Sequence, residues 1–170
     1  MSPQSGAAMS PQSGAAMSPQ SEGSTGRTIL LLSGPNLNLL GSRQPEIYGT
    51  DTIDDHAARA ASVATELGYA LEHAQFNAEG ALVERIHAAR GSTAAIIINP
   101  GAFTHYAWAV HDALAAYDGV VVELHLSNTG RREAWRHTSV VSPVADAILA
   151  GLGAAGYPLA VRAAHELLSR

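Results

Sequence analysis

The chain has 170 residues, a length that suits one domain with a buried core. Hydrophobic residues make up 46% of it and charged residues 15%, as in ordinary globular proteins and unlike disordered ones. The net charge of −5 gives no reason to expect binding to nucleic acid or to an anionic membrane, and the absence of Cys excludes disulfides, thiol catalysis and Cys-ligated zinc.

The chain opens on repeated copies of MSPQSGAA, a segment rich in Ser, Pro, Gly and Gln. Such a segment buries too little apolar surface to offset the entropy cost of ordering. We therefore predict a disordered tail over residues 1–26 and a single domain over residues 27–170. The tail lacks the basic start and apolar stretch of a secretory signal, and no later stretch suits a membrane span, so we expect a cytoplasmic protein.

Strand and helix signals alternate along the rest of the chain. Ile29–Ser33 is a short apolar run, typical of a strand that is buried on both faces. The spacing of Thr52 and Asp55 predicts a capping box that opens a helix, and Gly68 is predicted to end it. Residues 69–75 form the second predicted strand.

A second helix is predicted to be capped by Asn77 and to end before Gly91. Its apolar stripe consists of Leu82, Val83 and Ile86. A third strand over residues 94–98 and a third helix over residues 106–117 follow.

The last part of the chain continues the same alternation. Val120–His125 is the fourth predicted strand, residues 131–136 a short helical turn, and residues 147–150 the fifth strand. Pro158 suits the first turn of a last helix that runs to Leu168. The alternation predicts a parallel sheet with helices on both faces, in one three-layer α/β domain.

In such sheets the active crevice lies beyond the carboxyl ends of the strands. Polar residues of this chain collect at the predicted ends of four successive strands. These residues are Asn36, Arg43, Tyr48, Gln75, Asn77, Asn99, His105, Glu123, His125, Ser127, Arg132 and Arg136. Their positions predict a functional site at that edge of the sheet.

Tyr48 and Arg43 lie in one loop and suggest a base. A free tyrosine has a pKa of about 10 and is a poor base at neutral pH. The permanent charge of an arginine beside it lowers that pKa. The pair therefore predicts a tyrosinate that removes a carbon-bound proton next to a carbonyl. The alternative is a loop tyrosine that packs by its ring, with a solvated arginine nearby.

Glu123 and His125 suggest a general acid. They are two residues apart in a predicted strand, so their side chains point to the same face. A carboxylate beside an imidazole orients the ring and supports its protonated form. A structural hydrogen bond between a half-buried His and Glu is the alternative.

Other candidates are open to two interpretations. Arg132 and Arg136 would share one face of a helical turn and suit a carboxylate, phosphate or polyol, or they form a solvated surface. Asn99 and His105 suit a binding site, or a turn and an ordinary loop. No metal-binding, dinucleotide-binding, P-loop or Gly-x-Ser-x-Gly pattern is present, and the chain contains no Lys that could form an imine.

Five segments together resemble the type II 3-dehydroquinate dehydratases: GPNLNLLG-x-RQPEIYG, Q-x-NAEG, NPGAFTH, ELHLSN and RRE-x-WRH. The resemblance runs from Thr28 to Arg170 with the motifs in family order. It implies a flavodoxin-like three-layer sandwich with a five-stranded parallel sheet, no cofactor and no metal. The implied reaction is dehydration of 3-dehydroquinate to 3-dehydroshikimate, in the shikimate pathway of aromatic amino-acid biosynthesis or in quinate catabolism. The implied assembly is a homo-oligomer, a dodecamer built from trimers.

The resemblance also implies roles for individual residues. Tyr48 would be the base activated by Arg43, and the enolate would be held through a water near Asn36. His125, oriented by Glu123, would protonate the departing hydroxyl. The remaining residues would bind substrate: Asn99, Leu126 and Ser127 at the carboxylate, His105 and Arg136 at ring hydroxyls, Arg132 from a mobile loop, and Asp112 from a neighbouring subunit.

Six positions depart from the family pattern without removing a proposed catalytic group. They are expected to crowd the outer wall of the pocket, the mobile loop and the subunit contact: Phe76, Ala107, Trp108, His111, Gly130 and Thr138. A paralogue that dehydrates an amino analogue of dehydroquinate in secondary metabolism is therefore an alternative. A flavodoxin-like module that binds a nucleotide or flavin and a decayed scaffold are further alternatives.

Overall fold

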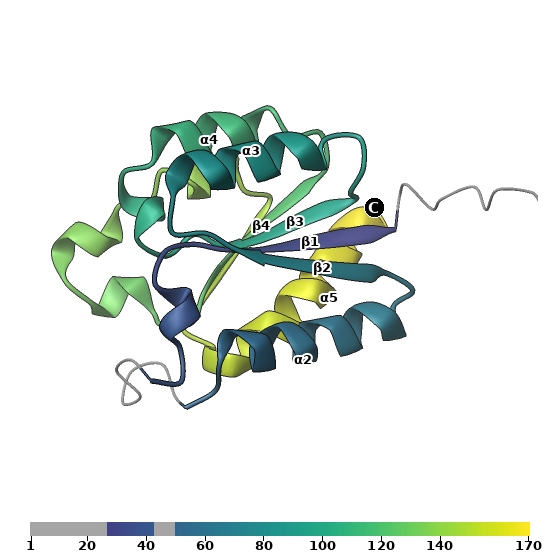
Figure 1. Cartoon of the computed structure of the whole chain (residues 1–170), viewed down its shortest axis with the longest axis horizontal. Coiled ribbons are helices and arrows are strands. Elements are labelled where there is room, and N and C mark those ends of the chain that lie inside the picture. The colour runs from purple at the N-terminus through teal and green to yellow at the C-terminus, as the bar shows by residue number, and fades with distance from the viewer. Residues whose placement is uncertain (1–26, 43–49) are drawn as a thin grey trace, which may run out of the picture.

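A five-stranded parallel sheet forms the middle layer of the molecule, with the strand order β2-β1-β3-β4-β5 (Figure 1). The computed structural model describes residues 27–42 and 50–170. The strands are β1 (Thr28–Ser33), β2 (Ala70–Gln75), β3 (Ala95–Asn99), β4 (Val120–His125) and β5 (Ala147–Ala150). This order is the flavodoxin-like one, so the predicted α/β fold class is confirmed.

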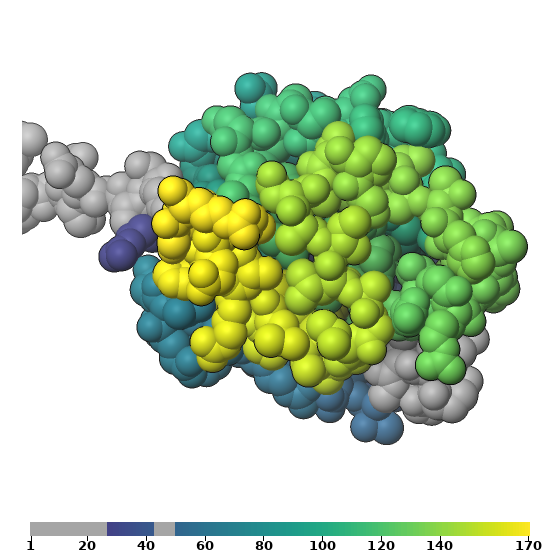
Figure 2. Space-filling view, turned by 180° about the vertical axis from the view of Figure 1, so that it is seen from behind, coloured from purple at the N-terminus to yellow at the C-terminus, as the bar shows by residue number. Residues whose placement is uncertain are grey.

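Helices cover both faces of the sheet (Figure 1). On one face lie α2 (Ile53–Glu66) and α5 (Gly156–Leu168), and on the other α3 (Glu79–Ala89) and α4 (Trp108–Ala115). In the view from behind, the yellow surface of α5 lies beside the yellow-green surface around β5 (Figure 2).

The alternation of side chains along β1 divides the core in two. Ile29 and Leu31 pack toward α2 and α5, whereas Leu30 and Leu32 pack toward α3 and α4. All four are fully buried, as the continuous apolar run of this strand predicted. The same alternation determines toward which face of the sheet each polar side chain at the strand ends points.

The start of α2 has the predicted capping box. The Thr52 hydroxyl accepts the backbone N–H of Asp55, and the Asp55 carboxylate accepts the backbone N–H of Thr52. The helix ends just before Gly68, whose φ of +81° is the left-handed conformation that glycine adopts without strain. Both predicted boundaries of this helix are confirmed.

The predicted cap of α3 is wrong. The residue before α3 is Ala78, and no side chain caps the helix there. The Asn77 side-chain oxygen instead accepts the backbone N–H of Asn36 and an amide hydrogen of Gln75. Because the loop after β1 supplies a competing donor, Asn77 joins two strand ends and does not cap the helix.

The predicted helical turn over residues 131–136 is also different in the structure. Two separate 3-10 turns stand there, η3 (Thr129–Arg131) and η4 (Ala134–His137). A further 3-10 turn, η2 (Gly101–His105), precedes α4, and η1 (Leu37–Leu39) follows β1. These turns lie around the carboxyl ends of the strands, at the left of Figure 1. Within the described ranges, no helix is long and apolar enough to cross a membrane.

One polar ring is buried between the sheet and helices α2 and α5. His56 of α2 has an exposed fraction of 0%, and neither ring nitrogen has a hydrogen-bond partner among the described residues. The ring stacks on Tyr157 of α5, with 4.7 Å between the ring centroids and an angle of 3° between the planes. Burial lowers the pKa of His56, more than the charges of Asp51, Arg59 and Asp55 change it. The fold therefore favours the neutral ring.

Replacing His56 with leucine is expected to stabilise the fold by about 1 to 2 kcal/mol, because two buried nitrogens without partners are removed. The gain should grow as the pH falls below 6.5, since the unfolded chain there binds a proton that the folded chain resists. Denaturant unfolding at low and neutral pH measures both effects, with the exposed His87 replaced by leucine as the control. A variant no more stable than the wild type at either pH would contradict this account.

Candidate active site

A pocket lies at the carboxyl ends of β1, β3 and β4. Eight of the predicted site residues line it: Asn36, Asn99, His105, His125, Leu126, Ser127, Arg132 and Arg136. Six further lining residues were not singled out in the sequence: Pro35, Leu37, Leu40, Gly101, Ala102 and Thr129. They are apolar or small residues that lie next to the polar ones. Their position beside the predicted polar residues in the sequence motifs is the signal that could have identified them.

The first loop is held close to the end of β3. A side chain at Gly34 would place its Cβ 2.1 Å from the carbonyl oxygen of Pro100, so the two strand ends approach too closely for any residue but glycine. The backbone N–H of Gly34 also donates to the carbonyl of Asn99, at 2.8 Å. Asn36 follows in a left-handed conformation with a φ of 65° and lines the pocket.

Glu123 and His125 form a buried pair on the face of the sheet toward α3 and α4. His125 Nε2 lies 2.9 Å from Glu123 Oε1, and since a carboxylate can only accept, Nε2 carries the proton. The other ring nitrogen, Nδ1, is then free of this bond. His125 lines the pocket, whereas Glu123 lies behind it with an exposed fraction of 0%. This is the shared face predicted from their spacing.

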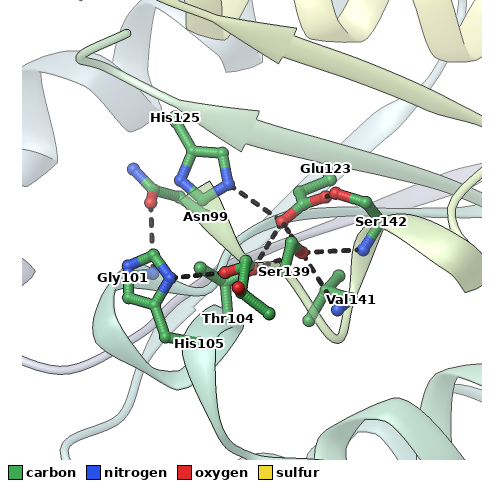
Figure 3. A network of polar contacts seen from close by, with 10 residues as sticks. Asn99, Gly101, Thr104, His105, Glu123, His125, Ser139, Val141 and Ser142 are labelled. Carbon is green, nitrogen blue, oxygen red and sulfur yellow. Dashed lines mark hydrogen bonds and ion pairs between the residues drawn. The ribbon is translucent and has the colours of Figure 1, made fainter. Parts of the chain in front are cut away.

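Three hydroxyl groups also hold the Glu123 carboxylate (Figure 3). Thr104 Oγ1 and Ser139 Oγ donate to Oε1 at 2.6 and 3.0 Å, and Ser142 Oγ donates to Oε2. Burial is the largest single influence on this carboxyl and raises its pKa, but the hydrogen bonds from His125, Ser142 and Thr104 outweigh it. The net result is a pKa below the ordinary value, so Glu123 is ionised at neutral pH.

Replacing Glu123 with glutamine is expected to destabilise the fold by about 2 to 4 kcal/mol. In this buried site the amide N–H groups of glutamine would face the hydroxyl and imidazole groups that donate to the carboxylate. The folded pKa of Glu123 is lowered, so its contribution is present above the unfolded value of 4.5 and is lost as the pH falls through the folded value. The variant should therefore lose part of the acid sensitivity of the wild type. Thermal unfolding measures this, with the exposed Glu84 replaced by glutamine as the control. Equal unfolding midpoints for both variants would contradict the role of this carboxylate.

Asn99 lies on the opposite face of the sheet, toward α2 and α5. Its Nδ2 donates to the hydroxyl of Tyr157 at 3.2 Å, and its Oδ1 accepts the backbone N–H of Gly101 at 3.4 Å. Burial raises the pKa of Tyr157 to about 12, against the smaller effects of hydrogen bonds with Asn99 and Ser33. Tyr157 was not among the predicted residues, since it is 58 residues away from Asn99 and nothing near it in the sequence marks it.

The basic side chains after β4 converge on one carboxylate. Arg132 Nε and Arg136 Nε lie 3.5 and 2.9 Å from Glu133 Oε2. Arg132 Nη1 also lies 3.4 Å from Ser127 Oγ. Both arginines line the pocket because they pair with the same carboxylate, Glu133, and because the turns η3 and η4 bring them there. They do not lie on one face of a single helical turn.

His105 reaches the pocket from η2. Its Nδ1 donates to the carbonyl oxygen of Thr138 at 2.7 Å, and its ring meets the edge of Trp135, with 5.1 Å between centroids. These contacts fix the ring beside the arginines. The pocket is thus lined by two guanidinium groups, two imidazoles and two amides, which suits a small anion that also carries hydroxyl groups.

Four of the predicted site residues do not line the described pocket: Glu123, which lies behind it, and Arg43, Tyr48 and Asp112. Arg43 and Tyr48 lie outside the residues that the structure describes. Asp112 is exposed on α4 and does not line the pocket. The six departing positions, Phe76, Ala107, Trp108, His111, Gly130 and Thr138, are likewise not among the residues that line it. In the described ranges, no group of three or more His, Asp or Glu side chains could hold a metal ion.

Comparison with known proteins agrees with this geometry. The sequence pattern of the family described as Dehydroquinase class II matches residues 27–165. The chain is 54% identical over 135 residues to a 3-dehydroquinate dehydratase of Cereibacter sphaeroides (strain KD131 / KCTC 12085), which covers 79% of this chain and 92% of the relative. It is 53% identical over 136 residues to a catabolic 3-dehydroquinase of Aspergillus clavatus, with 80% and 91% covered. The crystal structure of a type II dehydroquinase from Propionibacterium acnes superposes with a TM-score of 0.79 at 43% sequence identity, over 85% of this chain and 97% of that chain. The chain therefore belongs to the class II dehydroquinase family.

Proposed function

We propose that this protein dehydrates 3-dehydroquinate to 3-dehydroshikimate. The observation that carries the proposal is the Glu123–His125 pair, with 2.9 Å between the carboxylate and the ring, at a pocket that also presents Arg132 and Arg136. The names of the relatives supply the substrate, and both a dehydratase and a catabolic dehydroquinase are among them. The reaction therefore serves aromatic biosynthesis or quinate breakdown.

In the proposed mechanism Tyr48, ionised beside Arg43, takes a proton from the carbon next to the ketone. The electron pair of that C–H bond moves to the ketone oxygen, which a water held near Asn36 stabilises as an enolate. His125 then gives a proton to the departing hydroxyl, the C–O bond breaks, and the ring double bond forms as water leaves. Glu123 keeps the imidazole oriented and balances the charge of the protonated ring.

The same pocket supplies groups for binding. We assign Asn99, Ser127 and the Leu126–Ser127 backbone to the substrate carboxylate, and His105 and Arg136 to ring hydroxyls. Arg132 would close over the ligand from the segment after β4. What supports these assignments is that all of these residues line one pocket with His125. The route needs no amine, in agreement with a chain that contains no Lys.

The test is incubation of the purified chain with 3-dehydroquinate while the absorbance of the conjugated enone is followed. Steady formation of 3-dehydroshikimate is the expected result, and no product from a folded protein would overturn the proposal. The amino analogue of dehydroquinate, run in parallel, separates the alternative function. A higher kcat/KM on the analogue would assign the enzyme to secondary metabolism.

Assembly and location stay predictions. The proposal includes the expected dodecamer of trimers, in which Asp112 reaches a neighbouring site, and the expected cytoplasmic location. Tyr106, which follows η2, and Trp108, the first residue of α4, are 57% and 63% exposed. Exposed aromatic rings on and just before the helix that carries Asp112 support a subunit contact there.

A further inference from the structure

Hydroxyl groups from two separate segments enclose the Glu123 carboxylate behind the pocket (Figure 3). Thr104 comes from η2, and Ser139 and Ser142 come from the segment after η4. Thr104 Oγ1 and Ser139 Oγ lie 2.6 and 3.0 Å from Oε1, the oxygen that also takes the N–H of His125. Of the described residues, Ser142 alone donates to Oε2. Both oxygens of this fully buried carboxylate therefore carry hydrogen bonds.

The direction of these bonds follows from the other partners of Ser139. Its Oγ accepts the backbone N–H groups of Val141 and Ser142, at 3.1 and 2.9 Å, which occupy both lone pairs. The single Ser139 proton can therefore only be donated, to Glu123 or to the Thr104 hydroxyl 2.7 Å away. An ionised carboxylate has no proton to give, so the hydroxyls of Thr104 and Ser142 donate to it as well.

Other hydrogen bonds hold the serine segment, residues 138–142, against η2 and α4. The backbone N–H of Val140 donates to the carbonyl oxygen of Thr104 at 2.7 Å. The carbonyl oxygen of Thr138 accepts from His105 Nδ1, and that of Val140 accepts from His111 Nδ1, both at 2.7 Å. The serine segment is therefore fixed in place by bonds that do not involve the carboxylate.

We propose that the three hydroxyl groups set the acid strength of His125 through Glu123. Hydrogen bonds from the hydroxyls spread the charge of the carboxylate, so it holds the imidazolium proton less tightly than an unsupported carboxylate would. The proton on Nδ1 then passes to the departing hydroxyl, and the neutral ring keeps its Nε2–H bond to Glu123. The three residues are positioning residues, because they act through Glu123 and none of them lines the pocket. The inference rests on the proposed function, in which His125 is the general acid.

Other charged or titratable groups near this pair come from several elements. His105 in η2, Arg132 after η3 and Arg136 in η4 line the same pocket. Glu133 pairs with both arginines, and His111 of α4 bonds to the serine segment. None of these described groups bonds to the carboxylate of the pair, so substitution of a hydroxyl leaves their own contacts in place.

Ser142→Ala in the full chain tests the proposal by steady-state kinetics with 3-dehydroquinate. The variant leaves Oε2 without its donor, so the pair should hold its proton more tightly. The alkaline limb of the pH profile of kcat is then expected to move to higher pH by about one pH unit. At neutral pH, kcat should fall about 5- to 20-fold because the acid is weaker. KM should stay within about 3-fold of the wild type, since Ser142 does not line the pocket.

Further variants separate this effect from a folding defect. Thr104→Val removes a donor that comes from the other segment, and it should move the alkaline limb in the same direction. Ser142→Thr keeps the hydroxyl and should restore the wild-type profile. Ser92→Ala is the matched control, because the Ser92 hydroxyl bonds only to carbonyl oxygens at the end of α3 among the described residues. This control should change neither kcat nor its pH profile.

The position of the alkaline limb decides the inference. Limbs of Ser142→Ala and Thr104→Val that coincide with that of the wild type, or that lie at lower pH, would overturn the proposal while the enzyme remains active. A kcat lowered by the same factor at every pH would overturn it too, because the hydroxyls would then only support the fold. A wild type without turnover would instead overturn the proposed function, and with it the role assigned to His125.

Discussion

Replacing Tyr48 with phenylalanine is expected to lower kcat for 3-dehydroquinate by about 10³- to 10⁴-fold, because the group that accepts the carbon-bound proton is lost. The phenyl ring keeps the volume of the side chain, so KM should change only a few-fold. Such a loss of kcat at nearly constant KM is the signature of an interaction made in the transition state.

Steady-state rates from the enone absorbance measure this effect. Tyr117→Phe serves as the control, since the Tyr117 hydroxyl bonds to Thr93 and does not line the pocket. A Tyr48→Phe enzyme that kept more than about a tenth of the wild-type kcat would show that another residue is the base.

Replacing His125 with glutamine is expected to lower kcat by about 10²- to 10⁴-fold, because no acidic proton remains for the departing hydroxyl. A glutamine amide can still donate to Glu123, so the buried carboxylate keeps a partner and the fold should keep most of its stability. Activity and stability should therefore separate in this variant, whereas Glu123→Gln should lower both.

The comparison of kcat with the thermal midpoint tests that separation. His87→Gln, on the exposed part of α3, is the control for a histidine without a role in the pocket. A His125→Gln enzyme with a wild-type rate would remove His125 from the mechanism.

The acid and the binding amide come from opposite faces of the same sheet. Glu123 and His125 face α3 and α4, where Thr104, Ser139 and Ser142 hold the carboxylate. Asn99 faces α2 and α5, where Tyr157 holds the amide. The two supporting networks share no residue, so the effects of substitutions in one are expected to add to those in the other.

Features that follow from short-range patterns could be predicted from the sequence. The strand run at Ile29–Ser33, the capping box of Thr52 and Asp55, and the shared face of Glu123 and His125 depend on spacings of a few residues. The parallel sheet followed from the alternation of such segments.

Features that depend on contacts between distant segments could not be predicted in this way. Ser139 and Ser142 reach Glu123 across 16 and 19 residues, and Tyr157 reaches Asn99 across 58. Asn77 is of a residue type that often caps helices, but its side-chain oxygen accepts the backbone N–H of Asn36 after β1 instead. In each case a tertiary partner overrides or adds to the local preference.

The most direct test of the mechanism is deuterium exchange into recovered substrate in D₂O. If the base acts before the acid, His125→Gln should place deuterium on the carbon next to the ketone of 3-dehydroquinate, faster than in a sample without enzyme and without forming product. Tyr48→Phe should show only the rate of the sample without enzyme. Exchange in the Tyr48→Phe sample at the rate seen with His125→Gln would contradict the assignment of base and acid.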